Sequence, residues 1–183
     1  SLIGTENTKA VLSEKAMTAN FTNEGGVEYR FRFLKNIMGM WLFQNIRKNL
    51  DKKYTYDEMM QMAMDSDYDK LIDPTNDCFL APENMVEAIR NYLGKPELPI
   101  GDVLNSVYHS LAKSYNYALN EIQRLTGKKI DSINIVGGGS QDKYLNALTA
   151  EATGLEVFAG PVEGTAIGNL IVQMIAGGEF ADL

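Results

Sequence analysis

The chain has 183 residues, of which 45% are hydrophobic and 22% charged, and its formal net charge at pH 7 is −7. This length and composition are typical of one soluble globular domain with a sizeable core. The acidic balance argues against nucleic acid as a partner, because a protein that binds a phosphate backbone needs a basic stripe. With a single cysteine, no signal peptide and no apolar run of membrane-spanning length, we expect a cytoplasmic protein without an internal disulfide or a membrane contact.

The first part of the chain, residues 1–27, contains short apolar pieces separated by Gly, Asn and Thr. Such pieces predict strands joined by hairpin turns, the last turn lying at Asn23-Glu24-Gly25-Gly26. The pieces are Leu2-Ile3, Val11-Leu12 and Phe21.

Residues 28–127 are predicted to be mostly helical. A first helix is expected to run to Leu50, because apolar residues fall near helical spacing at Leu34, Ile37, Met38, Trp41 and Ile46. Within it we expect Trp41 to pack in the core. Thr55 and Glu58 form a capping-box pair that opens a methionine-rich helix, and methionines there are typical of a gap-filling core.

Two further helices are expected before residue 128. Pro82 should start one that Gly94 closes, and an Asp102 cap should start another that runs to Gly127. His109, on the second of these, has no Cys or His at ligand spacing, so a surface or core histidine is favoured over a metal ligand. Cys78 is expected to be a packed loop thiol, because nothing nearby supplies a base.

The last third alternates strand and helix. The pattern predicts strands at 132–136 and 155–158, and helices at 140–153 and 165–176 that Ser140 and the loop 159–163 introduce. Parallel strands with right-handed crossovers follow from this order, and ligands bind such sheets beyond the carboxyl ends of the strands. Glu163 lies at that edge, where a structural role is favoured over a ligand contact.

Three glycines, Gly137, Gly138 and Gly139, follow the first of these strands. A strand that enters a turn without side chains and then a helix makes a phosphate cradle, because the first amides of a helix lack partners and its dipole favours an anion. The alternative is a tight strand-to-helix connection. The run is neither a Walker A loop nor the dinucleotide fingerprint, since no Gly-Lys-Ser/Thr follows and the spacing differs.

Several blocks of this chain match one family. They are Val-Gly-Gly-Gly-Ser-Gln of 136–141, Leu-Asn-x-Leu-Thr-Ala of 145–150, Ala-Gly-Pro-Val-Glu-x-Thr-Ala-x-Gly-Asn of 159–169, Thr-Asn-Glu-Gly-Gly of 22–26 and Leu-Lys-Asn-Ile-Met-Gly-x-Trp-Leu-x-Gln of 34–44. With these blocks, nearly the whole chain resembles the C-terminal domain of the FGGY carbohydrate kinases. It looks most like the branch that phosphorylates L-rhamnulose. Asp142 departs from the usual Asn, which adds a negative charge near the phosphates, and Gly164 departs from the usual Ala.

The resemblance implies an α/β fold, an actin-like ATPase (ribonuclease H-like) domain over residues 1–183, as the C-terminal half of a two-domain sugar kinase. ATP with Mg²⁺ is the implied cofactor, and L-rhamnulose or a related ketose is the implied substrate. The residues carried over as nucleotide-binding are Gly137, Gly138, Gly139, Gln141 and Gln44, and Asn36 is carried over as a sugar contact. Asn36 and Gln44 are eight apart, which places them on roughly one face of the helix expected here.

Phosphoryl transfer also needs a carboxylate that orients the attacking hydroxyl. The resemblance places this catalytic Asp, the first phosphate loop and most of the sugar pocket in an N-terminal kinase domain, so no residue of this chain is expected to be catalytic and the chain alone is expected to be inactive. Three alternatives stay open. The domain could belong to a kinase of fuculose, xylulose or glycerol, or it could be a non-catalytic nucleotide-binding module. A Rossmann-like domain is disfavoured, because its glycine turn should follow the first strand.

Overall fold

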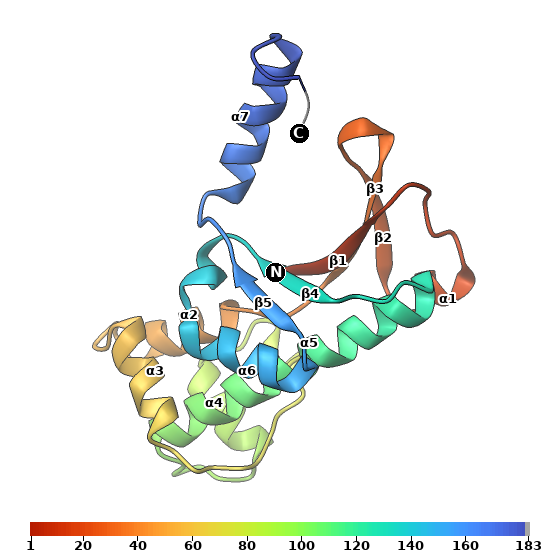
Figure 1. The fold of residues 1–183 in the computed structure, drawn as a ribbon. Helices are drawn as coiled ribbons and strands as arrows, with labels where there is room; N and C mark the ends of the chain where they lie inside the picture. The colour runs from red at the N-terminus through yellow and green to blue at the C-terminus, as the bar shows by residue number, and fades with distance from the viewer. Residues whose placement is uncertain (182–183) are drawn as a thin grey trace.

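The structure is a computed structural model that describes residues 1–181. It opens with a three-stranded antiparallel sheet of order β1-β3-β2, whose strands are β1 (Leu2–Asn7), β2 (Phe21–Gly25) and β3 (Phe31–Asn36) (Figure 1). In the register of this sheet, Leu2 lies opposite Asn36, and Phe21 lies opposite Lys35. The strands predicted at the first and last apolar pieces are confirmed.

The middle apolar piece is not a strand. Val11 and Leu12 lie in a loop, Leu12 is 87% exposed, and the short helix α1 (Glu14–Thr18) follows with Ser13 as its N-cap. A single-turn helix η1 (Val27–Tyr29) then leads into β3. Two apolar residues are too few to form a strand unless a neighbouring strand pairs with them, and none does in residues 1–181.

The long helix predicted to end at Leu50 is wrong in its first half. Residues up to Asn36 form β3, and only α2 (Trp41–Asn49) is helical. Leu34 pairs with both neighbouring strands, and these partners outweigh the local helical spacing. Trp41 is also not packed in the core as predicted, because it opens α2 with 47% of its surface exposed.

The capping box of Thr55 and Glu58 is confirmed at the start of α3 (Tyr56–Met64). Its methionines are partly core, since Met59 is buried while Met64 is 52% exposed. A long connection with the single-turn helix η2 (Asp77–Phe79) follows. Cys78 is exposed there rather than packed, and desolvation raises the pKa of its thiol, which opposes reactivity.

The two helices that follow begin differently from the prediction. Asn84, not Pro82, caps α4 (Met85–Tyr92). The long helix α5 (Ile100–Thr126) begins after Pro99, and Asp102 lies in its first turn, where it accepts a hydrogen bond from the Ser66 hydroxyl at 2.6 Å. The predicted end at Gly127 is confirmed, with φ of 69° in the left-handed region.

Helix α5 contributes to two separate hydrophobic cores. Its first half packs with α2, α3, α4 and α6 in the larger core, and Ile122 in its second half joins the smaller core under the antiparallel sheet. The smaller core contains Phe21 and Phe33, whose rings stack with centroids 4.5 Å apart. The Lys35 ammonium also bonds the Glu121 carboxylate at 2.7 Å, which fixes the end of β3 on α5.

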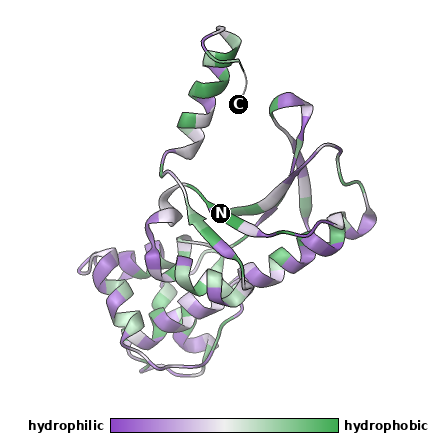
Figure 2. Ribbon diagram, in the orientation of Figure 1, coloured by the Kyte–Doolittle hydropathy of each residue, from purple (hydrophilic) through white to green (hydrophobic). Residues whose placement is uncertain are grey.

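The last third has the predicted alternation. Strands β4 (Ser132–Ile135) and β5 (Glu156–Ala159) form a parallel pair, α6 (Lys143–Thr153) connects them, and α7 (Gly164–Ala176) follows. Helix α7 projects from the body of the domain with hydrophobic residues along it, and none of its residues is buried (Figures 1 and 2). Among residues 1–181, no helix has the length and apolar character needed to cross a membrane.

Candidate functional site

The glycine loop, Gly137 to Gly139, lies at the carboxyl edge of the parallel strands beside the turn that follows β5. Two backbone hydrogen bonds join the two turns, one from the Gly160 amide to the Ile135 carbonyl at 2.7 Å and one from the Gly137 amide to the Pro161 carbonyl at 3.2 Å. The predicted meeting of both turns at one edge is therefore confirmed.

The glycine loop leaves its backbone accessible. Gly137 has φ of 83° and ψ of −167°, a conformation that only glycine adopts readily. A Cβ atom at Gly137 or Gly138 would meet no atom within 4 Å. Within residues 1–181, the amides of Gly138 and Gly139 donate to no other backbone group. The loop therefore offers donor groups and open space to a ligand.

Ser140 does not open the following helix as predicted. Residues Gly138 to Gln141 form a single-turn helix, η3, and the Ser140 hydroxyl donates back to the Gly137 carbonyl at 2.7 Å. The N-cap of α6 is Asp142, whose Oδ1 accepts from the Leu145 amide at 3.0 Å. Ser and Asp are both good N-caps, but the extra turn places Ser140 inside η3, so that Asp142 caps α6.

Sequence reasoning missed a side chain that bonds Asp142, three residues beyond the glycine loop. The Tyr108 hydroxyl, on α5, donates to Asp142 Oδ2 at 2.8 Å. Burial of this phenol, reinforced by the negative charge of Asp142, raises its pKa above the ordinary value of 10.0. The pattern of residues after the glycines could have identified Asp142 as a helix cap. No local signal in the sequence links Asp142 to Tyr108, which lies 34 positions earlier.

Asn36 and Gln44 do not share a helix face as predicted, because Asn36 ends β3 and Gln44 lies on α2. Both side chains are exposed. Helix α2 is nevertheless linked to Asp142, three residues beyond the glycine loop, since the Phe43 and Tyr108 ring centroids lie 4.3 Å apart and Tyr108 bonds Asp142.

The segment between β3 and α2 also lies against α5. A Cβ atom at Gly39 would lie 3.7 Å from the Tyr115 hydroxyl. Burial raises the pKa of Tyr115, and the negative charge of Asp142 adds to this effect. The structure thus places the segment after Asn36 against α5, the helix that also bonds Asp142 through Tyr108.

Gln141 follows the glycine loop, and Glu163 lies in the turn after β5. Neither side chain forms a hydrogen bond or an ion pair within residues 1–181. Both side chains are exposed, and Glu163 precedes α7 without a capping bond from its carboxylate. The structural role favoured for Glu163 from the sequence is therefore not found. The turn itself packs on Val136, whose side chain would lie 3.1 Å from a Cβ at Gly160 and 3.2 Å from one at Gly164.

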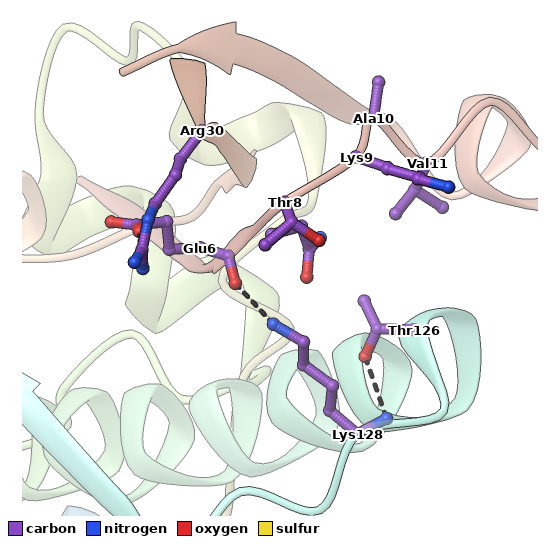
Figure 3. Close-up of a pocket in the computed structure, with 9 residues that line it drawn as sticks. Glu6, Thr8, Lys9, Ala10, Val11, Arg30, Thr126 and Lys128 are labelled. Atoms are coloured by element: carbon purple, nitrogen blue, oxygen red, sulfur yellow. Dashed lines mark hydrogen bonds and ion pairs between the residues drawn. The ribbon is translucent and has the colours of Figure 1, made fainter. Parts of the chain in front are cut away.

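Two hollows lie away from the glycine loop. Figure 3 shows one of about 550 Å³ between the end of β1 and the end of α5, where Lys128 donates to the Glu6 carbonyl and Arg30 pairs with the Glu6 carboxylate. The other, of about 630 Å³, contains exposed His109, whose Nε2 lies 3.4 Å from the Tyr144 hydroxyl. Across residues 1–181, no three His, Cys, Asp or Glu side chains gather as a metal-binding cluster.

Comparison with known proteins assigns the family. The profile described as "FGGY family of carbohydrate kinases, C-terminal domain" matches residues 1–177. The chain is 44% identical to a rhamnulokinase from Halalkalibacterium halodurans and 42% identical to one from Oceanobacillus iheyensis, over its whole length and 40% of each relative's length. A Bacillus subtilis rhamnulokinase is 38% identical over the whole chain and 39% of its own length.

The chain thus spans about two fifths of the length of the curated relatives it matches. Its mixed helices and sheets are consistent with the actin-like ATPase fold expected from the sequence. The chain therefore belongs to the FGGY family of carbohydrate kinases, of which it forms the C-terminal domain.

Proposed function

We propose that residues 1–183 are the nucleotide-binding half of an ATP-dependent kinase that transfers the γ-phosphoryl group of Mg-ATP to the 1-hydroxyl of L-rhamnulose. Support for the reaction class comes from the family, and support for the sugar comes from relatives named rhamnulokinase at 38–44% identity. An N-terminal domain, as implied by the family resemblance, would supply the catalytic carboxylate and most of the sugar pocket.

The observation that carries the proposal is the pair of free amides at Gly138 and Gly139. Backbone amides at the start of a helical turn bind phosphate oxygens through charge-assisted hydrogen bonds. The absence of a Cβ at Gly137 and Gly138 lets the phosphates lie directly on the backbone, and nothing within 4 Å blocks that approach. The loop thus fits the polyphosphate of a nucleotide.

Exposed polar side chains on η3, α2 and β3 complete the proposed contacts. Gln141 and Gln44 are proposed to contact the nucleotide, and Asn36 to contact the sugar at the cleft between the two domains. Magnesium would bind together with ATP, because the substrate phosphates usually supply some of its ligands. The protein then needs to contribute only one or two carboxylates. When bound, magnesium would neutralise charge on the transferred group.

A Gly138→Val substitution in the full-length kinase tests the nucleotide site. Gly138 has no positive φ and no neighbour within 4 Å of a Cβ, so the new side chain fits the fold but occupies the space proposed for the phosphates. Each lost contact with a charged acceptor is worth about 1.5–3 kcal/mol, so calorimetry should show ATP affinity reduced by about tenfold or more. Affinity for L-rhamnulose should barely change.

Gly25→Val is the matched control, because Gly25 also has an ordinary φ and open space and lies at the end of β2. It should leave ATP affinity unchanged. If the folded Gly138→Val enzyme bound ATP as tightly as the wild type, the glycines would only shape a tight turn and the nucleotide site would have to lie elsewhere.

A further inference from the structure

Asp142 holds the end of the glycine loop on the body of the domain. Its backbone amide donates to the Gly139 carbonyl at 3.2 Å, which closes the single turn η3. Its carboxylate accepts from the Leu145 amide at 3.0 Å through Oδ1 and from the Tyr108 hydroxyl at 2.8 Å through Oδ2. Both oxygens are thereby engaged away from the free amides of the loop.

Tyr108 is well suited to hold this carboxylate in place. The residue is only 2% exposed, and its ring packs against the rings of Phe43 and Tyr144, with centroids 4.3 and 4.9 Å away. A buried phenol packed against two rings has little freedom, so its hydroxyl is a fixed donor from α5 to Asp142. Glycines have no side chains with which to anchor the loop themselves.

We propose that Tyr108 and Asp142 form a positioning pair that sets the glycine loop for the nucleotide phosphates. This inference depends on the proposed nucleotide site. The Tyr108 bond fixes where η3 ends relative to α5. It also holds the negative carboxylate toward the core, so that the departure from the usual Asn costs little repulsion with the phosphates. Neither side chain touches the reacting atoms, so the pair acts through the loop.

The test is steady-state kinetics of the full-length kinase carrying Tyr108→Phe, with ATP and L-rhamnulose varied separately. The substitution keeps the buried ring and removes only the donor. We expect KM for ATP to rise about three- to tenfold, less than for a directly lost phosphate contact because the pair acts only through the loop, while KM for L-rhamnulose stays within about twofold. Tyr117→Phe, on an exposed residue of the same helix, should change neither value.

Two Asp142 variants sharpen the test. Asp142→Asn can still cap α6 and exchange a hydrogen bond with Tyr108, so its KM for ATP should stay near that of the wild type. Asp142→Ala should raise KM for ATP, and adding Tyr108→Phe to it should raise KM no further, because a pair that acts as a unit is not additive.

The outcomes separate this inference from the proposed function. If Gly138→Val weakens ATP binding but Tyr108→Phe leaves KM for ATP within twofold of the wild type, the positioning pair is wrong and the nucleotide site stands. A lower melting temperature for Tyr108→Phe with unchanged KM for ATP would also overturn the pair, since it would then serve only the fold. If neither variant affected ATP, both proposals would fall.

Discussion

Gly137 is the residue at which the chain turns from strand β4 into the glycine loop. Its φ of 83° and ψ of −167° fall in a region that residues with a Cβ enter only under strain. Gly138, the next residue, has no positive φ, although a Cβ there would meet no atom within 4 Å either. Gly137 therefore lacks a side chain because of its backbone conformation. Gly138 lacks one so that a ligand can reach the backbone.

This difference gives a prediction for two alanine variants of the domain. Gly137→Ala should lower the free energy of unfolding by about 1–3 kcal/mol, because the native conformation strains any residue with a Cβ. Gly138→Ala should stay within about 0.5 kcal/mol of the wild type, as is usual for an exposed site without special geometry. Chemical denaturation measures both, and equal losses would contradict the separation of roles.

At the same scale, the sequence predicted the glycine loop but not what anchors it. The apolar run and three glycines are a local signal, and the strand before them and the open backbone were both foreseeable. The choice between Ser140 and Asp142 as the helix cap was not, because both residue types cap helices well. The Tyr108 contact was also unforeseeable, because it depends on the packing of α5 against α6.

At the scale of elements, the misassigned segment is the one that contains Asn36. Its apolar residues fit helical spacing, yet its first half is β3, paired on both sides by β1 and β2. Strand pairing of this kind joins residues far apart in the chain, such as Leu2 with Asn36, so a reading of local spacing cannot detect it. Helix ends with explicit caps, such as Thr55 and Gly127, were predictable because their signals are local.

The capping box of α3 gives a pH-dependent prediction. The backbone amide of Thr55, and then its hydroxyl, donate to Glu58 and hold the pKa of this carboxyl below its ordinary value of 4.5. A lowered folded-state pKa means that the stabilisation is present above the unfolded pKa and is lost as pH falls through the folded one. Glu58→Ala should therefore lower the melting temperature at pH 7, and the difference from the wild type should shrink by about pH 3.

Glu87→Ala is the matched control for this measurement. Glu87 occupies the same third position of α4, and its cap Asn84 accepts from the Glu87 amide at 3.2 Å without a return bond from the Glu87 side chain. Its effect should depend less on pH. A Glu58→Ala difference that stayed constant from pH 7 to pH 3 would show that the charge of Glu58 contributes nothing to the box.

At the scale of the whole molecule, α5 is the element that joins two separately packed regions. It runs from the large helical core, through Tyr108, to the small core under the sheet at Ile122. Lys35, beside Asn36, and Asp142, just beyond the glycine loop, bond this helix at different points, Glu121 and Tyr108. A composition that suggested one sizeable core could not reveal this division, because it arises from where the sheet and the helices lie along α5.

The identity of the sugar is a property of the complete kinase, since this domain is proposed to contribute only Asn36 to the sugar site. For the full-length enzyme we predict the highest kcat/KM with L-rhamnulose, above L-fuculose, xylulose, glycerol and gluconate, in a coupled assay of ADP release. A higher value for any of the other four would reject L-rhamnulose as the substrate while leaving the kinase assignment and the glycine loop intact.

Helix α7 has a consequence for the behaviour of the domain in concentrated solution. Its apolar residues include Ile167 and Leu170, which are 44% and 58% exposed, on a chain whose net charge is −7. Like charge keeps copies apart at low ionic strength, but salt shortens the reach of that repulsion to about 10 Å at 0.1 M. The attraction between exposed apolar helices does not weaken in the same way. The colloidal stability of the isolated domain should therefore be greatest in dilute buffer and decline as salt is added.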